Sequence, residues 1–222
     1  MSDPVPDRTR RMVPRVAAAA AIAAAIVAIV LTLVVTGRLG SDNENAPESG
    51  GQELPEGFYL SPAPRIELDD FTGQRFDSRS LLGSPYLVTF LYTRCRDVCP
   101  LIGQDIRDSL RALESDSDEV NAVAVSVDPR GDTPRRVADW IRDQDLPENF
   151  HYLTGTEKQL RPVWERWFTV SAGETKINPK THASSVWVVD SQNRLRSRYS
   201  GSAGIDTDAL SAELRDLNDQ AG

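Results

Sequence analysis

The sequence predicts an α/β sandwich, and three observations support this fold class. Short apolar runs with the length of buried strands recur along the chain, at 86–92, 120–127 and 185–190. Between them lie longer stretches in which apolar residues recur with helical spacing. Proline or a capping residue marks the point where most of these stretches begin. Strands and helices that alternate in this way pack as helices on a mostly parallel sheet.

An uncharged stretch of twenty residues, 16–35, is dominated by Ala, Val, Ile and Leu. A helix of that length spans a hydrocarbon core of roughly 30 Å, so we expect a single transmembrane anchor at 16–36. A cleaved signal peptide is the alternative, although its apolar region is usually only about 7–15 residues long. Four arginines precede the stretch and one closely follows it, which predicts that 1–15 are cytoplasmic. We therefore expect a single-pass protein of the cell membrane, with its functional domain on the extracytoplasmic side.

The segment 37–57 is rich in acidic residues, glycine, proline and serine and has almost nothing apolar to bury. It is predicted to be a flexible acidic linker. The remaining residues, 58–222, suffice for one domain of ordinary size. The net charge of the 222-residue chain is −8, and this excludes nucleic acid as a partner because phosphate neutralisation requires a basic surface.

A small hairpin is expected at the start of the domain, with an edge strand at 64–70 and a return strand at 74–77 across a Thr-Gly turn. The run YLVTFLY at 86–92 is short, apolar and rich in β-branched and aromatic residues, as in a strand buried on both faces. A helix follows, because Pro100 suits a first helical position and apolar residues recur with helical spacing up to Leu113.

The rest of the domain repeats this alternation. Further strands are expected at 120–127, 150–153, 185–190 and 194–199, and helices are expected to begin near Pro134, Thr156 and Asp206. Asp132 and Thr133 are both candidates for the cap of the helix at Pro134. Trp164 and Trp167 share one helix face, and we interpret them as core residues. The complete pattern is typical of a thioredoxin-like α/β sandwich.

The two cysteines of the chain, Cys95 and Cys99, lie where the strand at 86–92 ends and the next helix begins. Unpaired amides and the positive end of the helix dipole lower the pKa of a thiol there and favour the thiolate. The alternatives are a structural disulfide or two neighbouring core cysteines, but a disulfide that closes so short a loop stabilises a fold only weakly. Three residues separate the cysteines, one more than in the CxxC of dithiol oxidoreductases, and this spacing leaves room for a metal ion.

The chain also has two histidines. His151 falls within an expected short strand, and we interpret it as a core or surface residue. His182 follows a polar loop at 173–181 and stands at the mouth of the strand at 185–190. Its position alone leaves its role open.

Three motifs resemble those of the SCO/SenC family of copper chaperones for cytochrome c oxidase: TRCRDVCP at 93–100, SVDPRGDTP at 126–134 and the histidine of THASSVWVVD at 181–190. The resemblance covers roughly 66–217 and implies a thioredoxin-like fold with an N-terminal hairpin extension. It places the copper ligands of the family on Cys95, Cys99 and His182, and so implies one copper ion, Cu(I) or Cu(II), per chain. Two thiolates and an imidazole form a soft donor set that suits copper and lacks the fourth ligand of a structural zinc site.

Three positions depart from the family pattern. Arg96 stands where many relatives have proline between the cysteines, which could loosen the turn. Thr181 precedes the histidine where many relatives have aspartate, so a nearby carboxylate is missing. Gly131 replaces an arginine common in the second motif, and this leaves the role of that loop open.

The resemblance implies a membrane-anchored extracytoplasmic copper chaperone that delivers copper to the CuA centre of cytochrome c oxidase subunit II. The alternative is an enzyme, a thiol-disulfide oxidoreductase in which Cys95 and Cys99 are catalytic and reduce the CuA-site cysteines or other extracytoplasmic disulfides. A copper or redox sensor is a third reading. Besides subunit II, we expect other copper carriers or thiol-disulfide proteins as partners.

Overall fold

The computed structural model divides the chain into two units, Met1–Ala46 and Pro47–Gly222. The residues that it describes all belong to the second unit and are 54, 58–114, 119–167 and 185–221. The predicted cytoplasmic segment, the transmembrane anchor and nearly all of the linker lie outside the described residues. Within the described ranges, no helix is long and apolar enough to cross a membrane.

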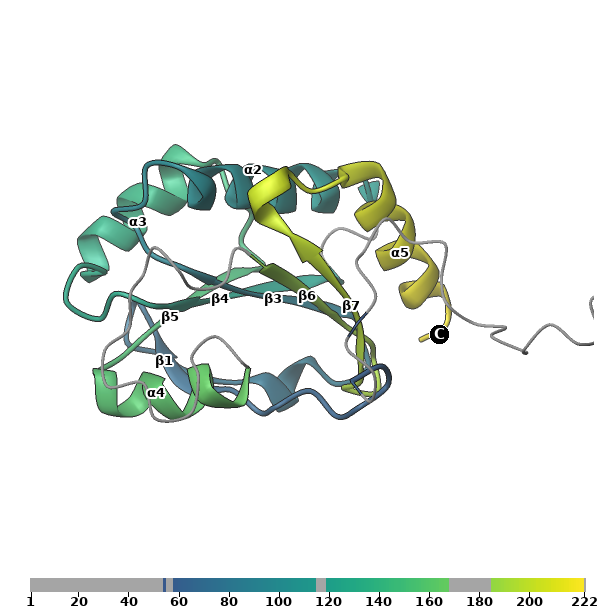
Figure 1. The fold of residues 1–222 in the computed structure, drawn as a ribbon, viewed down its shortest axis with the longest axis horizontal. Helices are drawn as coiled ribbons and strands as arrows, with labels where there is room; N and C mark the ends of the chain where they lie inside the picture. Colours follow the sequence, from purple (N-terminus) through teal and green to yellow (C-terminus); the bar gives the residue numbers. More distant parts are fainter. Residues whose placement is uncertain (1–53, 55–57, 115–118, 168–184, 222) are drawn as a thin grey trace, which may run out of the picture. The chain divides into compact units, whose positions relative to one another are not determined.

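Seven strands of the described residues form one sheet, in the order β2-β1-β5-β4-β3-β6-β7 (Figure 1). The strands are β1 (Glu67–Asp70), β2 (Arg75–Asp77), β3 (Tyr86–Leu91), β4 (Asn121–Ser126), β5 (Phe150–Thr154), β6 (Ser185–Val189) and β7 (Leu195–Ser200). The three central strands β3, β4 and β5 are parallel, whereas β1 and β6 join them in antiparallel pairs. The predicted N-terminal hairpin is confirmed as the antiparallel pair of β1 and β2.

Helices cover both faces of this sheet. The α-helices are α2 (Val98–Arg111), α3 (Pro134–Asp143), α4 (Glu157–Arg166) and α5 (Thr207–Asp219), and the short 3-10 helices are η2 (Ser78–Leu81) and η4 (Gly201–Ala203). Figure 1 shows α2, α3 and α5 on one face and α4 on the other. The predicted α/β sandwich is therefore confirmed.

The central strand β3 explains why its sequence is apolar throughout. It lies between β4 and β6, and all six of its residues are buried. Side chains alternate between the two faces of a strand, so Leu87 and Leu91 pack in the core with α2, α3 and α5, while Val88 and Phe90 pack in the core with α4. A strand buried on both faces has no side that faces water, and its residues therefore show no polar alternation.

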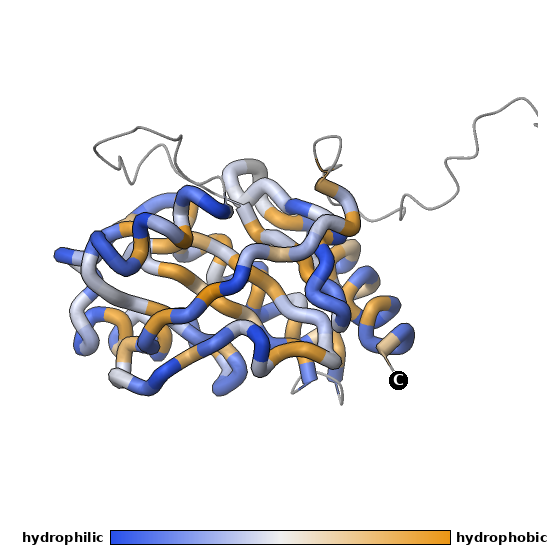
Figure 2. The backbone as a smooth tube through the Cα atoms, turned by 90° about the horizontal axis from the view of Figure 1, so that it is seen from below, coloured by the Kyte–Doolittle hydropathy of each residue, from blue (hydrophilic) through white to orange (hydrophobic). Residues whose placement is uncertain are grey.

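Trp164 and Trp167 are confirmed as core residues. Both are buried in the core beside α4, and their indole N–H groups donate to the carbonyls of Ser126 at 2.9 Å and Pro64 at 3.1 Å. Figure 2 shows hydrophobic residues along the segments that cross the interior, and hydrophobic and hydrophilic residues that alternate along the helical segments around them. The indoles thus bury a large apolar area while their one polar atom stays hydrogen-bonded.

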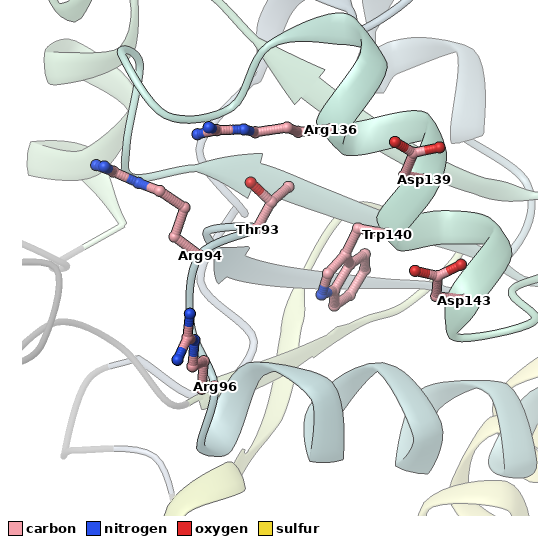
Figure 3. A pocket seen from close by; sticks show the side chains of 7 residues that line it. All are labelled: Thr93, Arg94, Arg96, Arg136, Asp139, Trp140 and Asp143. Carbon is pink, nitrogen blue, oxygen red and sulfur yellow. The ribbon is translucent and has the colours of Figure 1, made fainter.

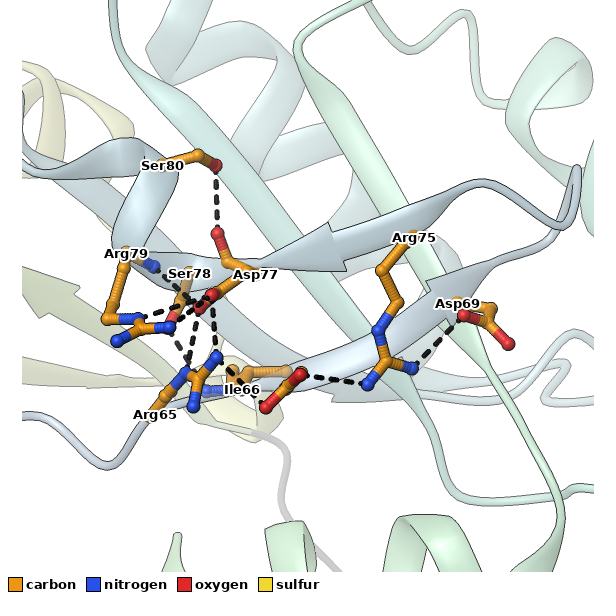
Figure 4. Close-up of polar contacts among 9 residues, drawn as sticks. Arg65, Ile66, Asp69, Arg75, Asp77, Ser78, Arg79 and Ser80 are labelled. Atoms are coloured by element: carbon orange, nitrogen blue, oxygen red, sulfur yellow. Dashed lines mark hydrogen bonds and ion pairs between the residues drawn. The ribbon is translucent and has the colours of Figure 1, made fainter.

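Ion pairs link the two strands of the N-terminal hairpin on its outer side (Figure 4). Asp77 accepts hydrogen bonds from Arg65 at 2.7 and 3.0 Å, and Arg75 bridges Glu67 and Asp69 of the neighbouring strand. The hydrogen bonds from the Arg65 guanidinium hold the pKa of Asp77 well below its usual range. Because water screens these exposed charges, the pairs set the geometry of the hairpin more than they stabilise it.

The starts of two helices refine the sequence prediction. α2 begins at Val98, so Pro100 occupies the third helical position and not the first. Proline is tolerated there because the first amides of a helix have no acceptor within it. Thr133 caps α3, since its hydroxyl accepts a hydrogen bond from the Arg136 amide at 3.4 Å. Of the two candidate caps, Asp132 is therefore free for another role.

We predict that Leu87→Ala lowers the free energy of unfolding by about 2–5 kcal/mol, because it leaves a cavity in the core under α2. Leu82→Ala is the matched control, since Leu82 is 53% exposed whereas Leu87 is fully buried. The control should change stability by no more than about 0.5 kcal/mol. Urea denaturation of the domain from Leu54 onward measures both, and an equal loss in the two variants would contradict the assignment of β3 to the core.

Candidate functional site

The turn between β3 and α2 carries both cysteines. β3 ends at Leu91 and α2 begins at Val98, so Cys95 lies in the connecting turn and Cys99 in the first turn of the helix. Both thiols are free, and the two residues are 7% and 4% exposed, respectively. The Cys99 amide donates a hydrogen bond to Cys95 Sγ at 3.3 Å. The cysteines therefore lie together where a strand leads into a helix, as the sequence predicts.

The two thiols differ in acidity. Burial opposes ionisation of Cys95, but hydrogen bonds from the Cys99 thiol, from the Asp97 and Cys99 amides and from the Tyr92 hydroxyl outweigh it and lower the pKa of Cys95. Burial, reinforced by the neighbouring Cys95 sulfur, raises the pKa of the Cys99 thiol well above its usual range. The expectation that the helix start favours a thiolate is thus confirmed for Cys95 and wrong for Cys99, where desolvation dominates.

Asp132 joins the second motif to the first. Its buried carboxylate accepts hydrogen bonds from the Thr93 amide at 2.8 Å, the Thr93 hydroxyl at 2.7 Å and the Tyr152 hydroxyl at 3.0 Å. The Ser126 hydroxyl donates to the same carboxylate. Burial raises the pKa of Asp132 although these hydrogen bonds oppose the shift. The residue therefore fixes the end of β3, and with it the start of the cysteine turn.

A second link between the motifs accounts for the glycine at 131. Arg94 donates to Asp128 Oδ2 from Nε at 2.8 Å and from its terminal nitrogen at 2.6 Å. A Cβ atom on Gly131 would lie 2.0 Å from Asp128 Oδ2 and 2.6 Å from Arg94 Nε. Gly131, where the family pattern commonly has arginine, thus leaves the space in which Arg94 and Asp128 pair.

Of the two histidines, only His151 belongs to the residues that the structure describes. His151 lies on β5, where its Nε2 is 2.9 Å from Asn121 Oδ1 and its ring packs 5.1 Å from that of Phe76. Burial lowers the pKa of His151, and its contacts fit the predicted structural role. His182 and the neighbouring Thr181 lie outside the described residues.

The entry of the chain into β6 bears on the third ligand. β6 is antiparallel to β3, with Val186 opposite Thr89, and the Thr89 hydroxyl donates to the Ser185 carbonyl at 3.0 Å. The first residue of β6 therefore lies beside the end of β3, from which the chain leads into the cysteine turn. Among the described residues, no group of three or more His, Cys, Asp or Glu side chains is arranged to hold a metal ion.

Residues that sequence reasoning did not assign to the site surround the cysteines. The Tyr92 carbonyl accepts a hydrogen bond from the Cys95 amide at 3.2 Å. Burial and the neighbouring Cys95 sulfur raise the pKa of Tyr92 to about 12. The polar residues Thr93 and Asp132 bind each other across 39 positions of sequence. Their presence in two separate motifs is the one sequence feature that could have indicated this pairing.

Together the sheet and the cysteines define a class: a thioredoxin-like α/β protein with a pair of free thiols in the turn that leads from a central strand into a helix. The model of the SCO1/SenC family matches residues 63–218. This chain belongs to that family, and the resemblance seen in the sequence is confirmed.

Individual relatives agree with the family match. The SCO1 protein homolog of Bacillus subtilis is 23% identical over 177 residues, which are 75% of this chain and 87% of that protein. An SCO2-like protein of Rickettsia prowazekii is 28% identical over 139 residues, 60% of this chain and 67% of that one. ScoI of Bradyrhizobium japonicum, solved with copper bound, superposes with a TM-score of 0.58 at 26% identity and covers 71% of this chain and 99% of its own.

We predict that Gly131→Ala lowers the free energy of unfolding by about 1–3 kcal/mol, since the added methyl group has to displace Asp128 from its ion pair with Arg94. Gly155→Ala is the control, because its Cβ would meet Gln159 at an ordinary 3.5 Å. Urea denaturation compares the two variants. A loss in the control as large as that in Gly131→Ala would show that the crowding around Asp128 has no consequence.

The unequal acidities predict that iodoacetamide modifies Cys95 before Cys99 at pH 7. Only the thiolate reacts, and a lowered pKa gives Cys95 the larger thiolate fraction at that pH, whereas Cys99 remains protonated. Peptide mapping locates the label. It requires a protease that does not cleave at arginine, because cleavage at Arg94 and Arg96 would leave Cys95 in a dipeptide. Earlier labelling of Cys99 would contradict the order of the two pKa values.

Proposed function

We propose that this chain binds one copper ion, Cu(I) or Cu(II), through Cys95, Cys99 and His182 and delivers it to the CuA centre of cytochrome c oxidase subunit II. The observation that carries the proposal is the pair of free, adjacent thiols at the start of α2. Support comes from the SCO1/SenC match and from the 26% identical ScoI that was solved with copper bound.

The described residues fit copper as a cargo. The lowered pKa of Cys95 favours the thiolate that a metal requires, and Cys99 has to release its proton when the metal binds. Thiolate sulfur is a soft donor that suits Cu(I), and an imidazole makes the set suitable for Cu(II) as well. Both cysteines are almost buried, which shields the ion from water until a partner receives it.

His182 as the third ligand is supported by connectivity. The residue precedes Ser185 by three positions, and so its Cα lies within about 11 Å of that of Ser185. Ser185 in turn lies beside β3, at the sheet edge that leads to the cysteines. The short separation in sequence between His182 and Ser185 thus supports His182 as a ligand of a metal held by Cys95 and Cys99.

The proposal retains the membrane anchor at 16–36, with the domain on the extracytoplasmic side. It is supported by the length of the uncharged stretch and by the arginines that precede it. Such an anchor keeps a copper carrier next to a membrane-bound acceptor, where the acidic linker lets the domain reach it.

A second function, thiol-disulfide exchange, is favoured by the unequal acidities of the cysteines. The Cys95 thiolate would attack a disulfide of the substrate and release one of its sulfurs as a thiolate. Cys99 would then lose its proton and attack Cys95, which releases the second substrate thiol and leaves a Cys95–Cys99 disulfide. The substrate gains two electrons and the chain loses two, so an external dithiol has to reduce the pair before the next cycle.

We predict that His182→Ala weakens Cu(II) binding far more than Cu(I) binding. Two thiolates still hold Cu(I) as a two-coordinate ion, whereas Cu(II) loses its only nitrogen ligand from the protein. His151→Ala is the control and should change neither affinity, because His151 lies on β5 and contacts Asn121 of β4 and Phe76 of β2. Copper titration and X-ray absorption of the reduced domain from Leu54 onward measure stoichiometry and ligands, and a copper shell without sulfur would refute the assignment.

The same variants separate the two functions in cells. Copper delivery requires that His182→Ala impairs assembly of cytochrome oxidase and that added copper restores it at least in part. If His182→Ala supports full assembly without added copper while Cys95→Ser does not, thiol-disulfide exchange takes the place of copper delivery.

A further inference from the structure

A cavity of about 430 Å³ opens beside the cysteine turn, between that turn and α3. Its lining residues are mostly charged and are Thr93, Arg94, Arg96, Arg136, Asp139, Trp140 and Asp143. Figure 3 shows arginine side chains on one side of the cavity and the Trp140 indole with the two aspartates on the other. Three of the lining residues, Thr93, Arg94 and Arg96, belong to the turn that carries Cys95, so the cavity borders the cysteine turn.

The acidic side chains of the cavity are already neutralised. Arg142, which is outside the lining, pairs with Asp139 at 2.9 Å and with Asp143 at 2.9 Å. Arg135 lies 4.0 Å from Asp139 as a further partner. The two carboxylates therefore do not satisfy the arginines that face them across the cavity.

Two of the arginines lack a carboxylate partner among the described residues. Arg94 pairs with Asp128, but within the described residues the Arg136 guanidinium donates only to the Gly131 carbonyl at 3.4 Å. Arg96 is exposed and has no hydrogen bond or ion pair within the described part of the chain. On a chain with a net charge of −8, two guanidinium groups at one cavity, neither with a carboxylate partner in the described part of the chain, form a local site for an anion.

Trp140 adds an apolar wall and an unused donor. The residue is 7% exposed, and its Nε1 has no acceptor among the described residues. Its ring sits tightly over Gly103, where a Cβ would lie 2.9 Å from the indole. The cavity therefore combines an aromatic surface, which suits the aliphatic part of a side chain, with guanidinium groups that bind carboxylates in a forked geometry.

We propose that this cavity is the docking site for a carboxylate-rich segment of the protein that exchanges copper with this chain. The assignment rests on the proposed function, because the position beside Cys95 and Cys99 matters for an incoming or outgoing metal ion. Bound glutamate or aspartate side chains would pair with Arg96 and Arg136 and hold the partner's own ligands close to the cysteines. Since like charges repel the acidic remainder of this chain, the cavity also fixes where the acidic segment binds.

The test uses the full-length reduced chain in non-ionic detergent and a fluorescently labelled hexaglutamate peptide, with hexaglutamine carrying the same label as the neutral control. Anisotropy should show binding of hexaglutamate that weakens as sodium chloride screens the charges. The double variant Arg96→Gln/Arg136→Gln should bind the peptide at least tenfold more weakly. Arg166→Gln, the same change at an exposed position of α4 on the other face of the sheet (Figure 1), should alter affinity less than twofold.

A third variant tests the charge balance of the cavity. Arg142→Gln removes the partner of Asp139 and Asp143 without touching the lining, and the freed carboxylates should weaken hexaglutamate binding severalfold. Equal affinity in the double variant and the unchanged chain, or an equal loss in Arg166→Gln, would overturn the proposal. So would displacement of the peptide by inorganic phosphate at the same concentration, because that result identifies a small-anion site.

Copper binding is measured on the same samples, so that two failures remain distinguishable. Absence of copper binding in the unchanged chain contradicts the proposed function. An unchanged peptide affinity in Arg96→Gln/Arg136→Gln contradicts only the docking site, provided that circular dichroism shows the variant to be folded.

Discussion

The buried carboxylate of Asp132 is the constraint on which the site depends. Water cannot solvate this carboxylate, and so its oxygens require donors from the protein. Those donors come from Thr93 after β3, Ser126 at the end of β4 and Tyr152 on β5. One side chain thus ties together the three parallel strands. Asp132 binds Thr93 through two hydrogen bonds, and the cysteine turn begins at Thr93. The position of Cys95 therefore depends on the hydrogen bonds of Asp132 as well as on the turn itself.

Much of the fold follows from local sequence pattern. The unbroken apolar run of β3 indicates a strand with two buried faces, and it is found at the centre of the sheet. Trp164 and Trp167 recur with helical spacing and both enter the core. The proximity of Cys95 and Cys99 also follows, because a turn from strand to helix cannot separate residues four positions apart. These features depend on neighbours in sequence, which is why they could be predicted.

What the sequence did not reveal depends on contacts between distant residues. Local pattern leaves Asp132 and Thr133 as equal candidates for a helix cap, whereas in the folded chain Asp132 binds Thr93, 39 positions earlier. Burial in the core raises the pKa of Cys99, and this burial cannot be predicted from the neighbouring residues in the sequence. The pairing of Arg94 with Asp128 spans 34 positions. The third proposed ligand, at position 182, lies outside the described residues.

The space at Gly131 has a consequence for how relatives of this chain diverge. A side chain at this position competes with the Arg94–Asp128 ion pair for the same volume. A larger side chain at 131 and the Arg94–Asp128 pair therefore cannot both keep these positions. Across the family, positions 94 and 131 are therefore expected to covary, with glycine at 131 where arginine precedes the first cysteine.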